Sequence, residues 1–190
     1  MENAQARFDR ALEEYEQASD LIRGLDERFR LSAGVRYDPE VTQRQFDIIL
    51  QAILLQMSLA DGRFDRLEQQ FVDKLIRCGD LLGYLRASGE AAVPKHWKGI
   101  ARMKPDDRDA LLALLPRVLS RECDSFVKPL ALADAADERD FLAELVSCLR
   151  VITESLSFMD GSSTEDELRC GDRAIVDMIQ QRWSDILKDA

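Results

Sequence analysis

Two short acidic stretches share one spacing of residues. The first is SLADGRFDRLE, residues 58 to 68, and the second is SFMDGSSTEDE, residues 157 to 167. Both read Ser-x-x-Asp-Gly followed by five residues and a Glu. Grouped carboxylates can ligate a hard cation such as Ca²⁺ or Mg²⁺, or act as acid and base in catalysis. The candidates for such chemistry are Asp61, Asp65, Glu68, Asp160, Glu165 and Glu167.

Helix capping explains most of these residues without a ligand. Residues 65–68 and 164–167 both have the form of a capping box, in which Asp or Thr accepts a first-turn amide and Glu reaches back. The glycine of each stretch would then end the preceding helix. This interpretation leaves Asp61 and Asp160 without a role.

The EF-hand calcium loop also contains Asp-Gly-x5-Glu, at its fifth, sixth and twelfth positions. Its first and third positions would fall on Met57 and Leu59 in one copy and on Leu156 and Phe158 in the other. Apolar side chains cannot ligate Ca²⁺, so the sequence argues against an EF-hand.

The sequence contains no recognisable catalytic motif. It has no Gly-rich phosphate loop and no Gly-x-Ser-x-Gly elbow, and His96 is its one histidine. We therefore expect a protein that is not an enzyme, with an acid-catalysed or metal-assisted hydrolase as the enzyme alternative. No Cys-x-x-Cys pair occurs, and we expect buried free thiols at Cys78, Cys123, Cys148 and Cys170.

Composition and charge narrow the class of partner. The 190 residues are 46% hydrophobic and 33% charged, with a net charge of −10. Basic residues are interleaved with acidic ones, as in RALEEYEQ and KPDDRD, so nucleic acid is not the expected partner, whereas basic proteins and cations are. The apolar stretch FDIILQAILLQMSLA is too short and polar to span a bilayer, and the N-terminus lacks a signal peptide pattern. We expect a cytoplasmic protein.

The elements that must position the acidic residues all have helical periodicity. We predict a single all-α domain, a compact bundle of about seven to eight helices. It comprises an N-terminal helix (4–30), a first half-repeat (38–87), a connector (88–105) and a second half-repeat (106–187). Expected helices cover 39–60, 65–78, 80–87, a helix from 105 that Pro116 kinks or interrupts, a piece near 123–133, 137–159 and 164–187.

The helix over 39–60 is predicted to be central, because apolar residues cover nearly its whole circumference. An apolar stripe that includes Phe8, Leu12 and Tyr15 runs along the first helix. If the rest of the chain leaves it uncovered, the stripe is an interface for a partner or a homodimer. Trp97, in the basic-aromatic stretch PKHWKG, is the other candidate for partner binding, although it can also fold back over the core.

The stretches MSLADGRFDRLEQQFVDKL and LSFMDGSSTEDELRCGDRAI resemble the tellurite-resistance TerB family and its TerB-like relatives. The resemblance covers roughly residues 40 to 78 and 137 to 180, and Thr164 departs from it by replacing an acidic residue. It implies two related helical hairpins and an acidic cluster that holds a divalent cation. Carried onto this chain, that cluster comprises Asp61, Glu68, Asp160 and Glu167, with Asp65 and Glu165 as neighbours.

Two functions follow as expectations. The resemblance implies a TerB-like accessory or scaffold module in a bacterial stress, tellurite-resistance or phage-defence type of system. The alternative is a metal-free helical adaptor, in which the repeated motif only caps and turns. That adaptor would bind a protein partner through its first helix or around Trp97.

Overall fold

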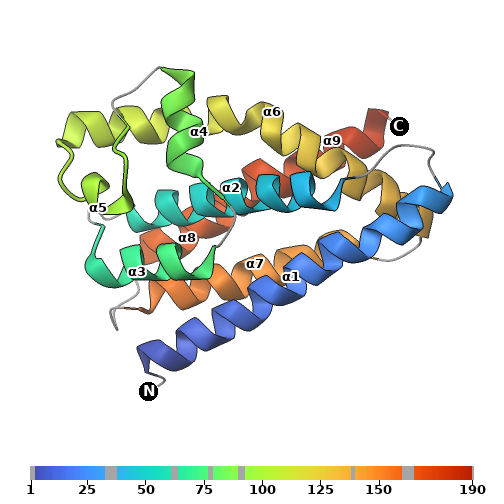
Figure 1. The fold of residues 1–190 in the computed structure, drawn as a ribbon, viewed down its shortest axis with the longest axis horizontal. Helices are drawn as coiled ribbons and strands as arrows, with labels where there is room; N and C mark the ends of the chain where they lie inside the picture. The colour runs from blue at the N-terminus through green and yellow to red at the C-terminus, as the bar shows by residue number, and fades with distance from the viewer. Residues whose placement is uncertain are drawn as a thin grey trace.

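The computed structural model describes residues 3–32, 38–60, 64–76, 79–89, 93–137, 140–159 and 165–189. Most of the described residues lie in helices, and none of them lies in a strand. They form eight helices when the three C-terminal segments, which follow one another without a break, are counted as one (Figure 1). The predicted all-α bundle is confirmed.

The helices follow the predicted order along the chain. Their bounds are α1 Ala4–Ser32, α2 Pro39–Ser58, α3 Arg66–Leu75, α4 Leu81–Ser88, α5 Trp97–Ile100, α6 Pro105–Asp137, α7 Phe141–Ser157 and α8 Glu165–Ile175, followed by a π-helical segment Val176–Gln180 and α9 Gln181–Asp189.

Helix α2 begins where local chemistry favours a start and then lies at the centre of the bundle. The Asp38 carboxylate accepts the amides of Glu40 and Val41 at 3.1 and 3.2 Å, and Pro39 occupies the first turn. The helix contacts α1, α6, α7 and α8, and its apolar residues are buried on nearly every side. The prediction of a central buried helix is confirmed.

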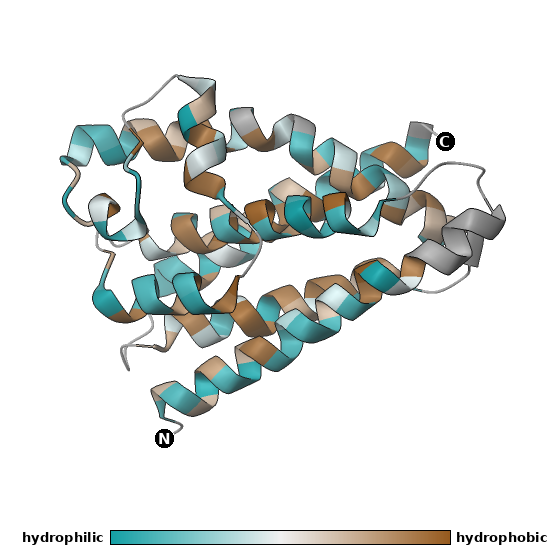
Figure 2. Ribbon diagram, in the orientation of Figure 1, coloured by the Kyte–Doolittle hydropathy of each residue, from teal (hydrophilic) through white to brown (hydrophobic). Residues whose placement is uncertain are grey.

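Helices α1 and α7 run side by side in opposite directions along one edge of the bundle (Figure 1). Hydrophobic and hydrophilic residues recur in turn along the helices, as expected for amphipathic elements that share a core (Figure 2). The two half-repeats are packed together, because α2 of the first contacts α7 and α8 of the second. Among the helices of the described ranges, none is both long and apolar enough to cross a membrane.

Helix α6 corrects one prediction. The sequence predicted that Pro116 kinks or interrupts the helix, and the structure rules out the interruption, because residues 105–137 form a single helix that passes through Pro116 and Pro129. A proline inside a helix removes one backbone donor and clashes with the preceding turn. Here Leu111, Leu115 and Leu119 are buried along one face, and this tertiary packing outweighs the local preference of proline.

The connector and the end of the third helix also differ from the predictions. The connector 88–105 contains a helical turn, α5, and the third helix ends at Leu75 instead of continuing to residue 78. Gly79 therefore does not end that helix. A Cβ at Gly79 would lie 2.8 Å from the Cβ of Asp47, so glycine is needed there for a close approach of the chain to α2.

Candidate functional site

The repeated acidic motif lies at the turns that join α2 to α3 and α7 to α8. Asp61, Gly62, Asp160, Gly161 and Thr164 fall outside the described residues. Their proposed roles as ligands, helix ends or caps stay predictions.

In the first copy, the acidic residues after the turn form a capping box. The Asp65 carboxylate accepts the Glu68 amide at 2.8 Å, and the Glu68 carboxylate accepts the Asp65 amide at 2.7 Å. These bonds satisfy two backbone donors at the start of α3, where the positive end of the helix also favours carboxylates. The capping interpretation of Asp65 and Glu68 is confirmed.

The second copy places its acidic residues differently. Glu165 is exposed and pairs with Arg169 one turn further along α8. Glu167 is only 9% exposed in the first turn of the same helix. The Glu167 side chain is therefore largely shielded from water, whereas most carboxylates in the described ranges are exposed.

The described carboxylates do not by themselves fit a metal site. Within the described ranges, no group of three or more His, Cys, Asp or Glu side chains is gathered around one point. A hard cation needs several oxygen ligands, and the Asp65 and Glu68 carboxylates already accept backbone amides. A cation site between the two hairpins would therefore need further ligands beside these, such as Asp61 and Asp160, which lie outside the described residues.

The serine that begins each motif is buried in both copies, but only one hydroxyl is satisfied. Ser157 Oγ donates to the Thr153 carbonyl at 3.1 Å. Ser58 Oγ, whose residue is 1% exposed, has no hydrogen-bond partner among the described residues. The two turns are therefore related in sequence but not equivalent in their bonding.

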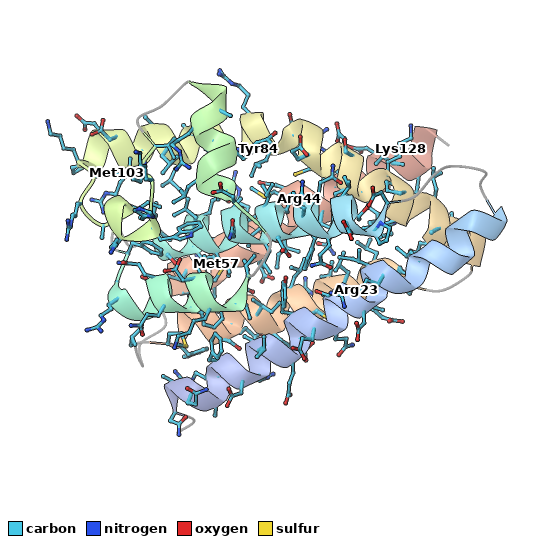
Figure 3. The ribbon with its side chains drawn as sticks, in the orientation of Figure 1. Arg23, Arg44, Met57, Tyr84, Met103 and Lys128 are labelled. Atoms are coloured by element: carbon cyan, nitrogen blue, oxygen red, sulfur yellow. The ribbon has the colours of Figure 1, made fainter. Side chains whose placement is uncertain are left out.

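The two copies meet where α8 crosses the end of α2. A Cβ added at Gly171 would lie 2.7 Å from Met57 Sδ, so α8 approaches α2 more closely there than a larger residue would permit (Figure 3). The Cys170 thiol lies 3.4 Å from the Gln56 carbonyl oxygen and donates to it. This contact fixes the second hairpin against the first.

The apolar stripe of α1 is used inside the chain. The rings of Phe8 and Phe71 meet edge to face at 5.9 Å, and Leu12 packs against the core. Tyr15 is buried, and its hydroxyl donates to Asp47 Oδ1 at 2.9 Å. Of the three residues that the sequence offered as a partner interface, the rest of the chain thus buries Tyr15 and partly covers Phe8 and Leu12.

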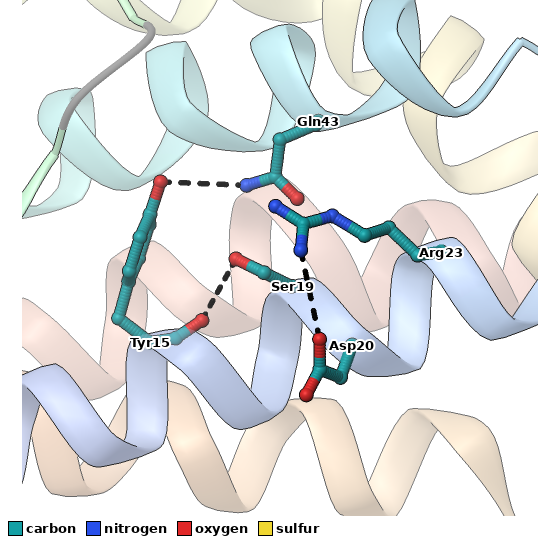
Figure 4. A network of polar contacts seen from close by, with 5 residues as sticks. All are labelled: Tyr15, Ser19, Asp20, Arg23 and Gln43. Atoms are coloured by element: carbon teal, nitrogen blue, oxygen red, sulfur yellow. Dashed lines mark hydrogen bonds and ion pairs between the residues drawn. The ribbon is translucent and has the colours of Figure 1, made fainter.

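A buried polar network joins α1 to α2. Asp47 is 0% exposed, and its Oδ1 also accepts from Gln43 Nε2 at 2.9 Å. Ser19 Oγ donates to the Tyr15 carbonyl at 2.8 Å on the α1 side of the network (Figure 4). Sequence reasoning treated Asp47 only as a polar residue in an apolar stretch. The tyrosine that satisfies it lies 32 positions away on another helix.

A groove of about 470 Å³ lies between α3, the start of α4 and the segment that leads into α5. We call it the Trp97 groove. Its lining residues are Arg66, Gln69, Gln70, Asp73, Asp80, Leu82, Lys95, His96, Trp97 and Lys98. Trp97 is half-buried, and its ring packs against Phe64 with 6.1 Å between ring centres. It covers the core, as one prediction proposed, and also lines the groove.

Specific contacts hold the segment that forms one wall of the Trp97 groove. Arg86 Nη1 donates to the Pro94 carbonyl at 2.9 Å and so ties the segment to α4. A Cβ at Gly99 would lie 2.6 Å from the Pro94 Cβ, which shows how tightly the chain turns into α5. Val93 and Met103, on either side, pack against the core. These contacts within the chain hold this wall of the groove in place.

The Trp97 groove is also the place where the interleaving of basic and acidic residues fails. Residues 95–104, KHWKGIARMK, hold four basic side chains and no acidic one, in a chain with net charge −10. Lys95 and Lys98 from this segment face the groove together with Arg66. Sequence reasoning noted the basic-aromatic stretch but could not show that α3 adds a third cation to it.

A second groove, of about 550 Å³, lies between α1 and the start of α7. It is lined by Glu13, Glu16, Gln17, Asp20, Leu21, Gly24, Phe141 and Glu144. Its several carboxylates are expected in a chain whose acidic residues outnumber its basic ones. None of its lining residues belongs to the repeated acidic motif. We call it the acidic groove.

The described cysteines are free thiols with little tendency to ionise. Cys123 and Cys148 are buried, and burial raises the pKa of each thiol to about 12. Burial also raises the pKa of Cys170. Cys78 lies outside the described residues. The prediction of buried free thiols is confirmed for Cys123 and Cys148.

Comparison of the sequence with models of known protein families gives no match, and neither does comparison with curated proteins or with solved structures.

Proposed function

We propose that this chain is a non-enzymatic helical scaffold module of the TerB-like kind, which binds a protein partner through the Trp97 groove. The scaffold is the bundle in which both helical hairpins share one core. The partner site is the Trp97 groove, which is lined by residues of α3 and α5. These two helices lie at the end of the bundle opposite the C-terminus (Figure 1).

The observation that carries the proposal is the preformed groove around a half-exposed tryptophan. Most apolar side chains of this protein are buried in the common core, whereas the Trp97 ring keeps part of its surface at the groove. Tryptophan is enriched where partners bind, because a large rigid ring contributes contact area at small entropic cost. The hydrogen bond from Arg86 to Pro94 and the contact of Phe64 with Trp97 reduce the entropic cost of binding further, because they already order the groove wall.

The cellular role in the proposal rests on the motif. The resemblance of the two Asp-Gly stretches to the TerB family supports an accessory role in a bacterial stress, tellurite-resistance or phage-defence type of system. Scaffold modules of such systems act by holding other proteins together, which agrees with a partner groove.

The experiment that tests the partner site is site-specific photocrosslinking in cells that produce the protein naturally. A photoreactive amino acid replaces Lys98 at the groove in one variant and Lys188 in α9 in the other. We expect a crosslink to one protein from position 98 that position 188 does not give, and that Trp97→Ala removes. Equal crosslinking from both positions contradicts the proposal.

A divalent cation held between the two hairpins is a second candidate function, and the buried Ser58 hydroxyl without a described partner favours it. That oxygen belongs to the residue that begins the first motif and precedes Asp61 by three positions. The test is thermal unfolding in chelator and then in millimolar Ca²⁺, Mg²⁺ or Mn²⁺. A cation that binds the folded state raises the midpoint, and Asp61→Ala and Asp160→Ala should each abolish the rise. Equal midpoints in chelator and in every cation contradict cation binding.

A further inference from the structure

We infer that the Trp97 groove binds an acidic segment of a partner protein, in which an apolar side chain flanked by carboxylates rests on Trp97. This inference rests on the proposed function, since it gives the chemistry of the partner at the same groove. It follows from the distribution of charge along the groove, from the exposed part of the tryptophan ring and from the groove's size.

The charges in the groove are separated along its length. Arg66 lies two residues after Phe64, whose ring touches Trp97, so the basic residues gather at the tryptophan end. Asp73 lies seven residues further along α3, a rise of about 10 Å at 1.5 Å per residue. The groove therefore has a basic end around Trp97 and an acidic end around Asp73.

The cations at the tryptophan end are available to a ligand. Arg66, Lys95 and Lys98 are exposed, and none forms an ion pair within the part of the chain that the structure describes. Asp80 is also in the lining, but its carboxylate accepts the Gly83 amide at 2.8 Å as the cap of α4. Three exposed cations in a groove that Trp97 also lines favour a ligand that carries carboxylates.

The tryptophan supplies the apolar part of the recognition. Phe64 covers one part of the Trp97 ring, and Leu82 adds apolar surface to the lining. An aromatic or aliphatic side chain that rests on the remaining surface would be stabilised by contact with the ring. The carboxylates on either side of that side chain would meet the lysines and Arg66.

A protein segment fits the groove better than a nucleic acid does. A volume of about 470 Å³ admits a few side chains, and the acidic end would repel a backbone that carries phosphates along its length. The net charge of −10 on the whole chain adds to that repulsion. An acidic peptide suffers the same long-range repulsion, but its charges can be confined to the tryptophan end.

The test is a fluorescence titration with two short peptides that differ only in charge. The probes are Glu-Glu-Phe-Glu and Lys-Lys-Phe-Lys, each blocked at both ends, and a single-stranded oligonucleotide is the third ligand. The chain has two tryptophans, and Trp183 is 1% exposed, so a change in emission on binding reports chiefly on Trp97. We expect saturable binding of the acidic peptide that weakens as the salt concentration rises.

A matched pair of double variants assigns the binding to the groove. Lys95→Glu with Lys98→Glu reverses two charges in the groove, and Lys128→Glu with Lys188→Glu reverses two exposed charges elsewhere. Lys128 lies on α6, toward the opposite end of the molecule (Figure 3). Both variants change the net charge equally. We expect the groove variant to lose affinity for the acidic peptide by about tenfold or more, and the control by about twofold or less.

Several outcomes would overturn the inference: no saturable binding of the acidic peptide, equal binding of the basic peptide, stronger binding of the oligonucleotide, or equal losses in the two double variants. Circular dichroism of each variant shows whether it is folded. A specific crosslink from position 98 combined with any of these outcomes would leave the proposed function standing while removing the acidic partner.

Discussion

The buried carboxylate of Asp47 shows how a single residue can tie two helices together. It lies in the apolar centre of α2 and accepts hydrogen bonds from Gln43 and from Tyr15 on α1. A buried charged or polar acceptor is tolerated only where donors replace the water that it has lost. Tyr15 therefore contributes to stability through a bond as well as through the area that its ring buries.

We expect Tyr15→Phe to lower the free energy of unfolding by about 1–3 kcal/mol, because Asp47, which is 0% exposed, loses a donor. Urea unfolding followed by circular dichroism measures the loss. Tyr84→Phe is the matched control, since the Tyr84 hydroxyl donates at 3.2 Å to Glu122 in a partly exposed setting (Figure 3). Equal losses in the two variants would show that the burial of Asp47 does not determine the cost.

The capping box at the start of α3 gives a second prediction. Asp65→Ala should lower the free energy of unfolding by about 1 kcal/mol, because the Glu68 amide loses its acceptor. Asp65→Asn, which keeps an oxygen in that position, should recover most of the loss. Both are measured in the presence of chelator, so that any effect of a cation is absent. If the two substitutions cost the same, capping is not the role of Asp65.

The burial of Cys123 and Cys148 leads to predictions about the chemical reactivity of their thiols and about the pH dependence of stability. The raised pKa values of Cys123 and Cys148 leave almost no thiolate at pH 8, so their modification by a disulfide reagent should be slow until the chain unfolds. A Cys78→Ser, Cys170→Ser variant confines the measurement to these two residues.

The same shifts predict lower stability at high pH. The unfolded chain loses its thiol protons near the ordinary pKa of 9.0, whereas the folded chain keeps them to about 12. The free energy of unfolding should therefore fall as the pH rises between those values. In a Cys123→Ala variant the free energy of unfolding should fall less steeply with pH. An unchanged slope would contradict the raised pKa of the Cys123 thiol.

At the scale of the element, two helical glycines have opposite surroundings. A Cβ added at Gly24 of α1 meets no atom within 4 Å, whereas one added at Gly171 of α8 meets the buried side chain of Met57. Glycine inside a helix costs conformational entropy, so it is favoured only where its lack of a side chain is needed.

We expect Gly24→Ala to raise the free energy of unfolding by about 0.5–1 kcal/mol. Gly171→Ala should lower it by about 1–3 kcal/mol, because the added methyl group overpacks the contact between α8 and α2. Thermal unfolding of the two variants compares the same chemical change in two environments. A gain in both would mean that Met57 moves aside at little cost and that the contact between the hairpins is loose.

At the scale of the whole molecule, the half-repeats share their core instead of forming two separate ones. Helix α8 packs on α2, and α1 lies along α7, so each half covers apolar surface of the other. The grooves are outer features of this one body. Because the Trp97 groove is formed by α3, α4 and α5, its shape depends on the packing of the first half-repeat against the rest.

We expect the chain to unfold in one cooperative transition, since neither half-repeat buries its apolar surface alone. In a Trp97→Phe variant, fluorescence reports on Trp183 near the C-terminus, and far-ultraviolet circular dichroism reports on all helices. The two urea transitions should coincide. A fluorescence transition at lower urea concentration would show that the C-terminal helices separate from the bundle first.

The features that short-range chemistry controls could be predicted from the sequence. Helical periodicity yields the all-α class, the central position of α2 and the buried faces of α7 and the C-terminal helices. Asp38 with Pro39 and Asp65 with Glu68 mark the starts of α2 and α3, because a cap bonds to amides only two or three residues away. The capping role of Asp65 and Glu68 in the first copy of the motif was thus predictable from the sequence.

Features that depend on residues far apart in the chain could be seen only once the chain was folded. Pro116 lies inside a continuous α6 because packing of the leucines around it outweighs a local preference. Tyr15 meets Asp47, and Arg66 joins Lys95 and Lys98 beside Trp97, because helices separated in sequence are pressed together. Periodicity shows which face of a helix is apolar but not which neighbour covers it. The sequence of any one helix therefore does not reveal a groove that three helices form together.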